Sequence, residues 1–476
     1  MCNYFTVFSE PYKSMKERKM SKDNKYEIDM CNGSIMDKLI SFALPLMLSG
    51  MLQLMFNAVD IVVVGRFSGS QSLAAVGATT ALIYLFTNLF IGISLGANVL
   101  SARYYAAGKK KEMSETVHTA MAFALVSGIV MIFVGLFFSR LALEIMGTPS
   151  DVIEQATLYM KIYFMGMPFF MLYNYGAAIL RAVGDTKRPL IFLIISGLVN
   201  ACLNMILVII FHMDVAGVAI ATVTSQCISC ILVVSCLCRT TSSYQLNFSK
   251  LRIKKEYLQP ICQVGIPAGI QSMVINLSNA LLQSSVNSFG STTMAGYTAA
   301  NNIFGFLYVS VNAVTQACMS FTSQNYGLQK LKRMDKILVE CLMLTVIISI
   351  LLGGGVYLFG AEIMRLYTKE PEVIRCGVDI FAYTTVTYFL CGIMDLFPGA
   401  LRGMDRSTVP MILSVIGTVG TRIVWVFGLF PHYRSLPFLF ISYPASWVIT
   451  IVMQVACFYF VRKKVHRESE MCLQSN

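Results

Sequence analysis

The sequence predicts an all-α membrane protein with twelve transmembrane helices, arranged as two parallel six-helix repeats around a central cleft. The mean hydropathy is +0.66 and only 13% of residues are charged, whereas soluble domains carry about 25% charged residues. Apolar runs of about 20 or more residues, the length that crosses a bilayer, recur along all 476 residues. Sequence anchors also recur at one fixed spacing, which indicates an internal duplication.

The apolar runs set the limits of the predicted spans, and polar or basic segments separate them. Several runs exceed the length that a bilayer needs, so these helices must tilt, kink or protrude. Candidate kinks lie at Pro45, Pro168, Pro267 and Pro398. The predicted spans are 38–64, 71–105, 116–138, 151–180, 187–211 and 214–238 in the first half, and 259–287, 292–326, 337–359, 376–401, 408–430 and 437–461 in the second.

The duplication divides the chain into two lobes. Leu180-Arg181-Ala182 matches Leu401-Arg402-Gly403 at a spacing of 221 residues, and Pro45 matches Pro267 after a one-residue indel. Six helices per copy is an even number, so both copies have the same orientation, as in transporters whose two halves enclose a substrate. We predict an N-lobe at 37–240, a linker at 241–258 and a C-lobe at 259–461, with tails at 1–36 and 462–476.

The basic residues set the predicted orientation. Most of the 37 Lys and Arg residues fall in alternate connecting segments, including 109–111, 252–255 and 330–333. The positive-inside rule therefore places both termini in the cytoplasm of a multi-pass protein of the cell membrane. The first 36 residues are too polar for a signal peptide, so the run from Leu39 is expected to remain as a span. The net charge of +12 is dispersed over short loops and does not indicate a nucleic-acid partner.

Buried polar residues in the first lobe form a candidate cation-coupling site. Asp60 interrupts an apolar run, where a carboxylate costs about 2.5–3.5 kcal/mol on insertion scales. At 1.5 Å per residue, several polar side chains lie about 8 to 12 Å inside the outer ends of their helices or somewhat deeper. Their oxygens would suit Na⁺, or would hydrogen-bond a protonated Asp60, whereas the alternative is a set of hydrogen bonds that only stabilises the bundle. The candidates are Asp60, Asn174, Asn200, Asn204 and Thr222.

The second lobe has two ionisable candidates, Asp395 and Arg422. The spacing of 221 maps Asp395 onto Asn174, so equivalent positions carry an acid in one lobe and an amide in the other. Asp395 and Arg422 either neutralise each other, or Asp395 contacts a cationic substrate or acts as a second protonation site. We place Gln53, Asn57, Asp395 and Arg422 in the substrate cleft.

Motifs for other chemistry are missing from the sequence. It contains no GxxxxGK[ST], no HExxH and no GxGxxG that opens a helix. Without an ATP site, uphill transport must be driven by an ion gradient. We therefore expect no enzymatic activity and no cofactor beyond the coupling ion, H⁺ or Na⁺ or both.

Several stretches resemble the multidrug and toxic compound extrusion (MATE) transporters of prokaryotes. They include FNAVDIVVVGR, LAAVGATTAL, ISLGANVLSARYYAAGKKKE, ILRAVGDTKRP and ALRGMDRSTVPM, and the resemblance covers roughly residues 37–461. It implies two six-helix lobes that face a central cleft, and export of organic, often cationic, amphiphiles in exchange for Na⁺ or H⁺. It also implies that the five N-lobe candidates form the cation site and that Pro45 is the bend in the first helix.

Two positions depart from the family pattern. Relatives often carry Asp in the pattern N-x-x-x-D, whereas this chain has Asn200-Ala-Cys-Leu-Asn204. A single carboxylate, whose charged form burial penalises, favours coupling to H⁺, or to H⁺ and Na⁺ alternately, over Na⁺ alone. Asp405 replaces a usual Gly in the loop after Arg402, with no consequence that the sequence reveals.

The main alternative function is that of a lipid-linked oligosaccharide flippase of the same superfamily. Such flippases often have extra helices and cationic clefts for pyrophosphate, whereas Arg422 is the only mid-span arginine in this sequence. A membrane-embedded enzyme or sensor lacks any supporting group of residues. We expect a monomer whose partners are small-molecule drugs or toxins and the lipid bilayer.

Overall fold

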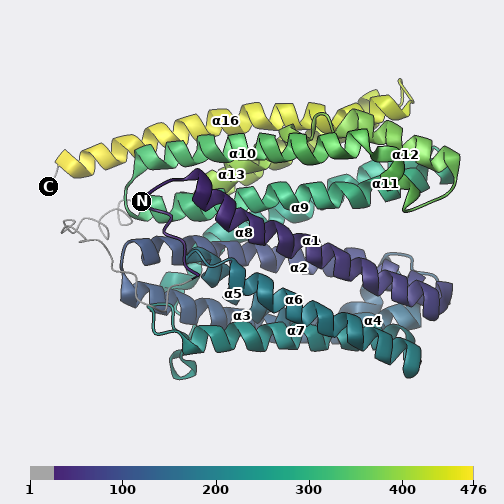
Figure 1. The fold of residues 1–476 in the computed structure, drawn as a ribbon, viewed down its shortest axis with the longest axis horizontal. Helices are drawn as coiled ribbons and strands as arrows, with labels where there is room; N and C mark the ends of the chain where they lie inside the picture. The colour runs from purple at the N-terminus through teal and green to yellow at the C-terminus, as the bar shows by residue number, and fades with distance from the viewer. Residues whose placement is uncertain (1–25, 475–476) are drawn as a thin grey trace.

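A computed structural model describes residues 26–474, and within this range the chain is helical without any β-strand (Figure 1). The described side chains exclude those of residue 70 and residues 468–474. The predicted tails therefore lie partly outside the described residues, at 1–25 and 475–476. The helices run side by side along the long axis of the molecule. We call the end of the bundle at which α1 begins and α16 ends the terminal face (Figure 1).

The first repeat extends from α1 to α7. The predicted span at 151–180 consists of two helices separated by Gly166, and Pro168 occupies the first turn of the second one, where its missing N–H leaves no helical bond unmade. The elements are α1 (Met36–Phe67), α2 (Gly69–Ala106), α3 (Lys110–Ile145), α4 (Ile153–Met165), α5 (Met167–Ala182), α6 (Lys187–Asn204), the π-helix η3 (Met205–Ile210) and α7 (Asp214–Arg239).

The second repeat extends from α8 to α16, after the short 3₁₀ helix η4 (Phe248–Lys250). Two π-helices, η5 and η6, interrupt its fifth span. The elements are α8 (Lys255–Asn287), α9 (Ser291–Gly327), α10 (Leu331–Leu358), α11 (Gly360–Arg365), α12 (Pro371–Thr384), α13 (Tyr388–Gly403), α14 (Thr408–Ser414), η5 (Val415–Gly420), α15 (Thr421–Val424), η6 (Trp425–Leu429) and α16 (Leu436–Gln474).

The predicted all-helical membrane fold is confirmed. Ten helices of the described chain are long and apolar enough to cross a membrane, and the pair α12 and α13, bent by 52°, makes eleven. The remaining predicted span is the broken helix formed by α4 and α5. Each of the twelve predicted spans is therefore helical, and the protein is a multi-pass membrane protein.

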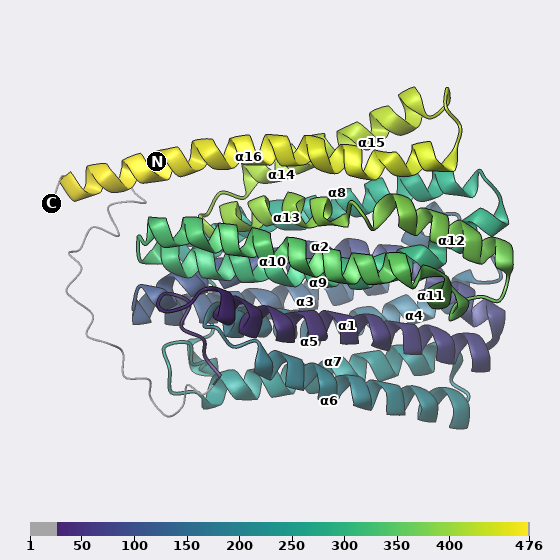
Figure 2. The same ribbon diagram turned by 45° about the horizontal axis from the view of Figure 1, so that its top comes forward.

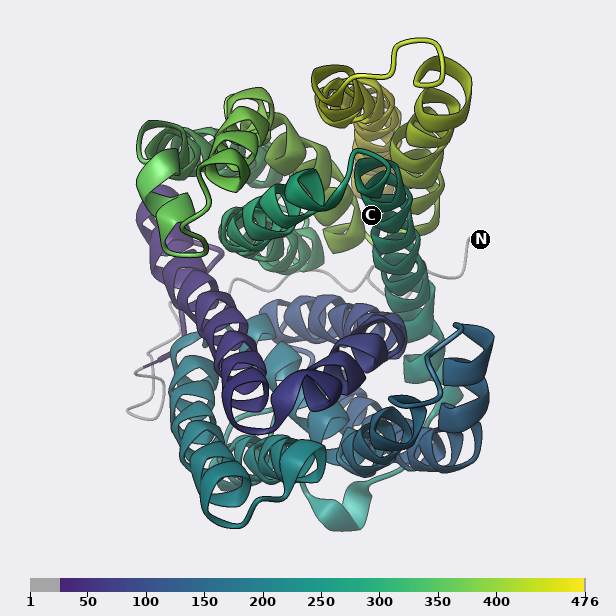
Figure 3. The ribbon, with the colours of Figure 1, turned by 90° about the vertical axis from the view of Figure 1, so that its right-hand side faces the viewer.

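The two repeats form two groups of helices that meet along one boundary. In the end-on view of Figure 3, α1 and α8 lie on opposite sides of the molecule and each reaches across this boundary. Accordingly, α1 packs against α9 of the second repeat, and α8 packs against α2 of the first. Figure 2 shows the last helices of the repeats, α7 and α16, near opposite edges of the bundle.

Small residues bring α2 and α8 into backbone contact. A Cβ atom on Gly92 would collide with the backbone of Gly269, and one on Gly96 would collide with the carbonyl of Ile261. In a bilayer, close approach of backbones is a main source of helix association, because lipid supplies no hydrophobic driving force. The α2–α8 contact is therefore a close-packed joint between the repeats.

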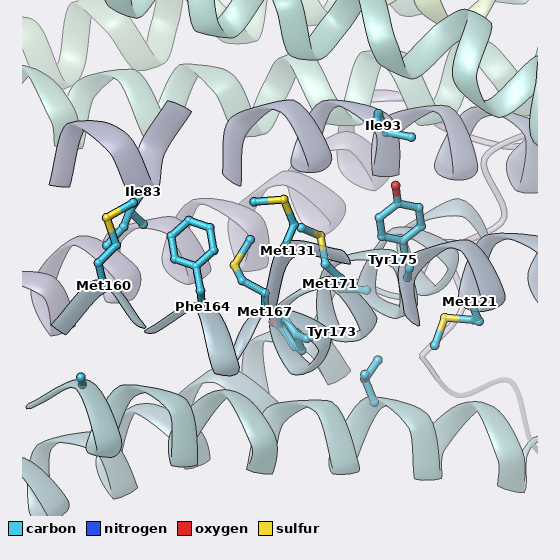
Figure 4. Packing of buried hydrophobic residues seen from close by; sticks show 14 of the residues in the cluster. Ile83, Ile93, Met121, Met131, Met160, Phe164, Met167, Met171, Tyr173 and Tyr175 are labelled. Carbon is cyan, nitrogen blue, oxygen red and sulfur yellow. The ribbon is translucent and has the colours of Figure 1, made fainter. Parts of the chain in front are cut away.

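The core of the first repeat holds α4 and α5 beside α3 and α7. Met131, Phe164, Met167 and Met171 gather between these helices (Figure 4). The methionine side chains are nearly or completely buried, and their flexibility suits the irregular space left by the break at Gly166. This packing fixes the helices that surround the polar site of the repeat.

Candidate functional site

Asp60 lies at the junction of α1, α6 and α7 in a small hydrogen-bonded group. Its carboxylate accepts a hydrogen bond from the Asn204 amide at the end of α6, and the Thr222 hydroxyl of α7 lies 3.5 Å from its other oxygen. The same Asn204 amide nitrogen lies 3.3 Å from the side-chain oxygen of Asn200, one turn earlier. Asn200 and Asn204 are 5% and 0% exposed. The structure thus brings together four of the five predicted cation-coupling residues.

The backbone of the fifth span changes form at this group. The α-helix α6 ends at Asn204, and the π-helix η3 follows directly. π-Helical turns inside α-helices are rare and occur frequently at functional sites. Because Asn204 donates both of its short contacts through one nitrogen, its side-chain oxygen Oδ1 remains a buried acceptor without a donor among the described residues.

The oxygens of this group fit a small monovalent cation. One carboxylate of Asp60, the free Oδ1 of Asn204 and the hydroxyl of Thr222 are hard oxygen donors around a single negative charge. The described residues contain no group of three or more His, Cys, Asp or Glu that could hold a metal ion. The residues therefore suit Na⁺, with Asn204 and Asn200 as neutral ligands, or a proton on Asp60.

Asn174 does not join this group. Its amide donates to the Phe170 carbonyl of its own helix at 2.8 Å, and none of its hydrogen bonds in the described chain reaches Asp60. Asn174 lies 21 residues after the start of α4, about 30 Å along the broken span, whereas Asp60 lies about 10 Å inside the outer end of α1. The expectation that Asn174 shares the depth of Asp60 is wrong, because the break at Gly166 lies in the outer half of its span.

Aromatic residues that the sequence analysis missed surround Asp60. Tyr159 and Tyr163 of α4 lie close enough to interact electrostatically with the carboxylate, and Tyr163 hydrogen-bonds Gln226 of α7. The two tyrosines are one turn apart and stack with ring centroids 6.3 Å apart. Their spacing of four residues on one helix face was the available signal.

The predicted cleft residues of α1 share a face with Asp60. Gln53, Asn57 and Asp60 follow the helical spacing i, i+4, i+7, and both amides are exposed. Nearer the terminal face, Pro45 lies within α1, and the Ser49 hydroxyl donates to the Pro45 carbonyl at 2.8 Å. The roles of Pro45 as a bend and of these amides as substrate contacts stay predictions.

In the second repeat, Asp395 and Arg422 do not form an ion pair. Asp395 of α13 hydrogen-bonds the Tyr308 hydroxyl of α9 and interacts electrostatically with Arg402, two turns along its own helix. Arg402 in turn donates to Gln271 of α8 at 2.7 Å. The alternative in which Arg422 neutralises Asp395 is therefore wrong, and Arg402 is the cation near this carboxylate.

Arg422 lies deeper in the second repeat among neutral partners. Its Nη1 lies 2.7 Å from Asn279 Oδ1 and 3.4 Å from Ser278 Oγ, both on α8. Its Nε lies 3.4 Å from Ser446 Oγ of α16, and its guanidinium carbon lies 4.6 Å from the ring centroid of Tyr443. Arg422 is 3% exposed.

Polar contacts join the two repeats at the terminal face. The hydroxyl of Ser323 in α9 donates to the Val99 carbonyl of α2 at 2.6 Å, and the Gln324 amide donates to the Ala182 carbonyl at 2.7 Å. Arg103 of α2 forms an ion pair with Asp405, in the loop after α13. These contacts close the boundary between the repeats at this end, and we call them the terminal seal.

The segment before α1 adds to the terminal seal. Glu27 accepts a hydrogen bond of 2.8 Å from Tyr244 at the end of the first repeat. A few residues later, the Cys31 thiol lies 3.5 Å from the side-chain oxygen of Gln324, and the Cys31 carbonyl accepts from Lys330 at 3.0 Å, both in the second repeat. Residues 26–35 therefore connect both repeats.

Asp405 has a backbone conformation that explains the glycine expected there. Its φ is +61°, in the left-handed region that favours Gly and tolerates Asp and Asn better than other residues. An aspartate in this position accepts some backbone strain and places its carboxylate against Arg103. The position that the sequence left unexplained is therefore a contact between the repeats.

The fold and its polar sites define a membrane transporter of two parallel helical repeats, each of which buries polar residues between its first, fifth and sixth spans.

The chain belongs to the MatE family, whose model matches residues 45–206 and 267–427, once in each repeat. It is similar to the probable multidrug resistance protein YoeA of Bacillus subtilis, with 29% identity over 89% of this chain and 93% of the relative. It is also similar to the probable multidrug resistance protein YpnP of the same organism, with 26% identity over 82% and 87% of the two chains. A solved outward-facing multidrug resistance MATE transporter superposes with a TM-score of 0.85 at 19% identity, over 95% of this chain and all of that one.

Proposed function

We propose that this transporter exports organic, often cationic, amphiphiles across the plasma membrane in exchange for H⁺ or Na⁺. The observation that carries the proposal is the buried carboxylate of Asp60, held by Asn204 and Thr222 at the junction of three helices. A residue that only stabilises helix packing need not be ionisable, and intramembrane acids mark ion pathways. The names of the relatives YoeA and YpnP supply the substrate class.

Ion binding at Asp60 changes what holds α1 to α6. A charged Asp60 accepts the hydrogen bond of the Asn204 amide nitrogen. A protonated carboxyl needs an acceptor instead, and the free Oδ1 of Asn204 supplies one after rotation of the amide. The same oxygen serves as a ligand when Na⁺ binds. Each ion therefore replaces the Asp60–Asn204 contact at the start of η3, where the backbone is already irregular.

The terminal face is the cytoplasmic face in this proposal, because most Lys and Arg residues of the loops gather there. The terminal seal then closes the path to the cytoplasm in the described structure. Alternating access requires the repeats to separate at this face when substrate enters, with the substrate path between the repeats.

Export is tested with a cationic dye of the ethidium type in cells that lack their own drug exporters. Expression should raise the tolerated dye dose and the efflux rate. Asp60→Asn removes the titratable charge with little change in volume, so the protein should accumulate normally while efflux falls to the background. Asp151→Asn is the matched control, because it removes an exposed acid from the outer end of the same repeat. Unchanged efflux by well-expressed Asp60→Asn would contradict the role of this carboxylate, and unchanged dye tolerance with a cell-envelope phenotype would indicate a flippase.

The coupling ion is tested in proteoliposomes with independent Na⁺ and pH gradients. The single carboxylate of the Asp60 group favours H⁺, or H⁺ and Na⁺ alternately, because burial penalises its charged form. Dye transport should therefore follow an imposed pH gradient without Na⁺. Transport that responds only to Na⁺ would refute H⁺ coupling and leave the export function intact.

A further inference from the structure

Arg422 is a buried cation without a carboxylate partner. Its contacts are two serine hydroxyls, the amide of Asn279 and the ring of Tyr443, all of them neutral. It takes part in no ion pair of the described chain. A charged side chain at membrane depth is costly, and removing the partner of a buried charge in soluble proteins costs about 3–5 kcal/mol. The structure therefore leaves one positive charge to be neutralised.

The repeat relates this cluster to the Asp60 group. At the spacing of 221 residues, Tyr443 corresponds to Thr222 and Arg422 to the residue after Asn200, while Asn279 corresponds to Asn57 after the one-residue indel. Both clusters therefore lie between the first, fifth and sixth spans of their repeats. They differ in sign, with a carboxylate in the first repeat and a guanidinium in the second.

The same change of backbone form accompanies both clusters. The π-helix η3 starts directly after Asn204, and the π-helix η6 starts at Trp425, the residue related to Asn204 by the spacing of 221. A second π-helix, η5, ends two residues before Arg422. π-Helical turns are rare enough that their recurrence at related positions indicates a site in each repeat.

We propose that Arg422, Ser278, Asn279 and Tyr443 form a binding site for one monovalent anion, either a small inorganic anion or the carboxylate of a bound molecule. Two donors are available, because Nη2 of Arg422 and Nδ2 of Asn279 have no hydrogen-bond partner in the described chain. One guanidinium neutralises one negative charge, and guanidinium groups match carboxylates and similar anions by shape. The other intramembrane arginine of the repeat, Arg402, already lies beside Asp395, so the site does not suit a dianion.

The two tryptophans of the chain report on this site. Trp425 follows Arg422 by three residues, and Trp447 directly follows Ser446. Tryptophan fluorescence of the purified full-length protein is therefore titrated with chloride, and separately with acetate, against gluconate at constant ionic strength. We expect a saturable change with chloride, acetate or both. A response to acetate alone identifies a carboxylate ligand, and a response that includes chloride identifies a small-anion site.

Two variants decide whether the response comes from this cluster. Arg422→Gln should abolish it, and Asn279→Asp should also abolish it, because a fixed carboxylate 2.7 Å from Nη1 replaces the anion. Asn287→Asp, an exposed position two turns further along α8, makes the same chemical change and should leave the response intact. In parallel, the melting temperature of the wild type should rise with the effective anion, as mass action requires, and that of Asn279→Asp should not.

The inference does not depend on the export proposal, because binding is measured on the purified protein. The absence of any saturable response in the wild type would overturn it. So would a wild-type response that persists in Arg422→Gln or in Asn279→Asp.

Discussion

Replacing Asp405 by Asn should loosen the contact between the repeats at the terminal face. The substitution keeps the size of the side chain and its tolerance of a left-handed backbone, and it removes the charge that pairs with Arg103. Arg103 then keeps only a cation–π contact with Tyr326, at 5.0 Å, because its Nε and Nη2 are buried without hydrogen-bond partners in the described chain. The buried guanidinium gains contact with water only if the repeats separate.

The size of the effect follows from the burial of the two side chains. Arg103 is 7% exposed and Asp405 is 33% exposed, so the pair lies between a buried and a surface ion pair. Hydrogen bonds to charged groups contribute about 1.5–3 kcal/mol. Since about 1.4 kcal/mol corresponds to a factor of ten, the ratio of closed to open terminal faces should fall by about 10- to 100-fold.

Cys31 supplies the assay, because its thiol is enclosed by the terminal seal. The residue is 7% exposed, and burial, together with the nearby carboxylate of Asp29, raises the pKa of the Cys31 thiol to about 12. The reactive thiolate is therefore scarce at pH 8 until the face opens and the pKa returns toward its ordinary value of about 8.5. Alkylation of Cys31, measured by mass spectrometry of its peptide, should accelerate by about 10- to 100-fold in Asp405→Asn.

Two controls separate opening from general loosening. Asp335→Asn removes an ion pair with Arg462 at the same face but within the second repeat, and it should not change alkylation of Cys31. Cys341 is fully buried inside the second repeat and should stay unreactive in every variant. Equal Cys31 alkylation in Asp405→Asn and the wild type, or a parallel rise at Cys341, would refute the reasoning.

The remaining predictions concern pH, substrate charge and helix packing. Because burial raises the pKa of Cys31, its contribution to stability is complete below about pH 8.5 and is lost as the pH rises toward 12, so the melting temperature of the wild type should fall more steeply than that of Cys31→Ser between about pH 9 and 10.5. Asp395→Asn should weaken efflux of a permanently cationic dye and spare a neutral amphiphile, because a carboxylate in a low dielectric attracts only the former strongly; equal losses for both compounds would end the selectivity claim. Gly96→Ala should lower stability by about 1–3 kcal/mol through collision with α8, measured as the melting temperature, whereas Gly77→Ala, with no atom within 4 Å of its Cβ, should not lower it.

Depth along a helix was predictable from the sequence wherever the helix is regular. A rise of 1.5 Å per residue was enough to place Asp60, Asn204 and Thr222 at one level, and the structure joins them by hydrogen bonds. The same rule failed for Asn174, because the break at Gly166 lies near the outer end of its span and leaves Asn174 closer to the terminal face. Its amide is then satisfied by its own helix.

Direction around a helix was harder to predict. Arg422 lies between the π-helices η5 and η6, and each residue inserted by such a turn rotates the following side chains relative to a regular α-helix. The sequence therefore could not show whether Arg422 faces Asp395 or α8. Asp405 was hidden for a different reason, because its contact with Arg103 depends on a left-handed backbone and on the docking of two distant loops.

The two contacts between the repeats differ in how readily they open. The α2–α8 joint consists of backbones in van der Waals contact, with no side chain whose rotation would release them. The terminal seal consists of hydrogen bonds that each contribute about 0.5–1.5 kcal/mol, together with the Arg103–Asp405 pair, and water replaces these partners when the face opens. A seal of a few such contacts sums to several kcal/mol, which is the range over which differential binding of a ligand reverses a two-state equilibrium. Substrate or ion binding is therefore sufficient to open the terminal seal, while the α2–α8 joint keeps the repeats together.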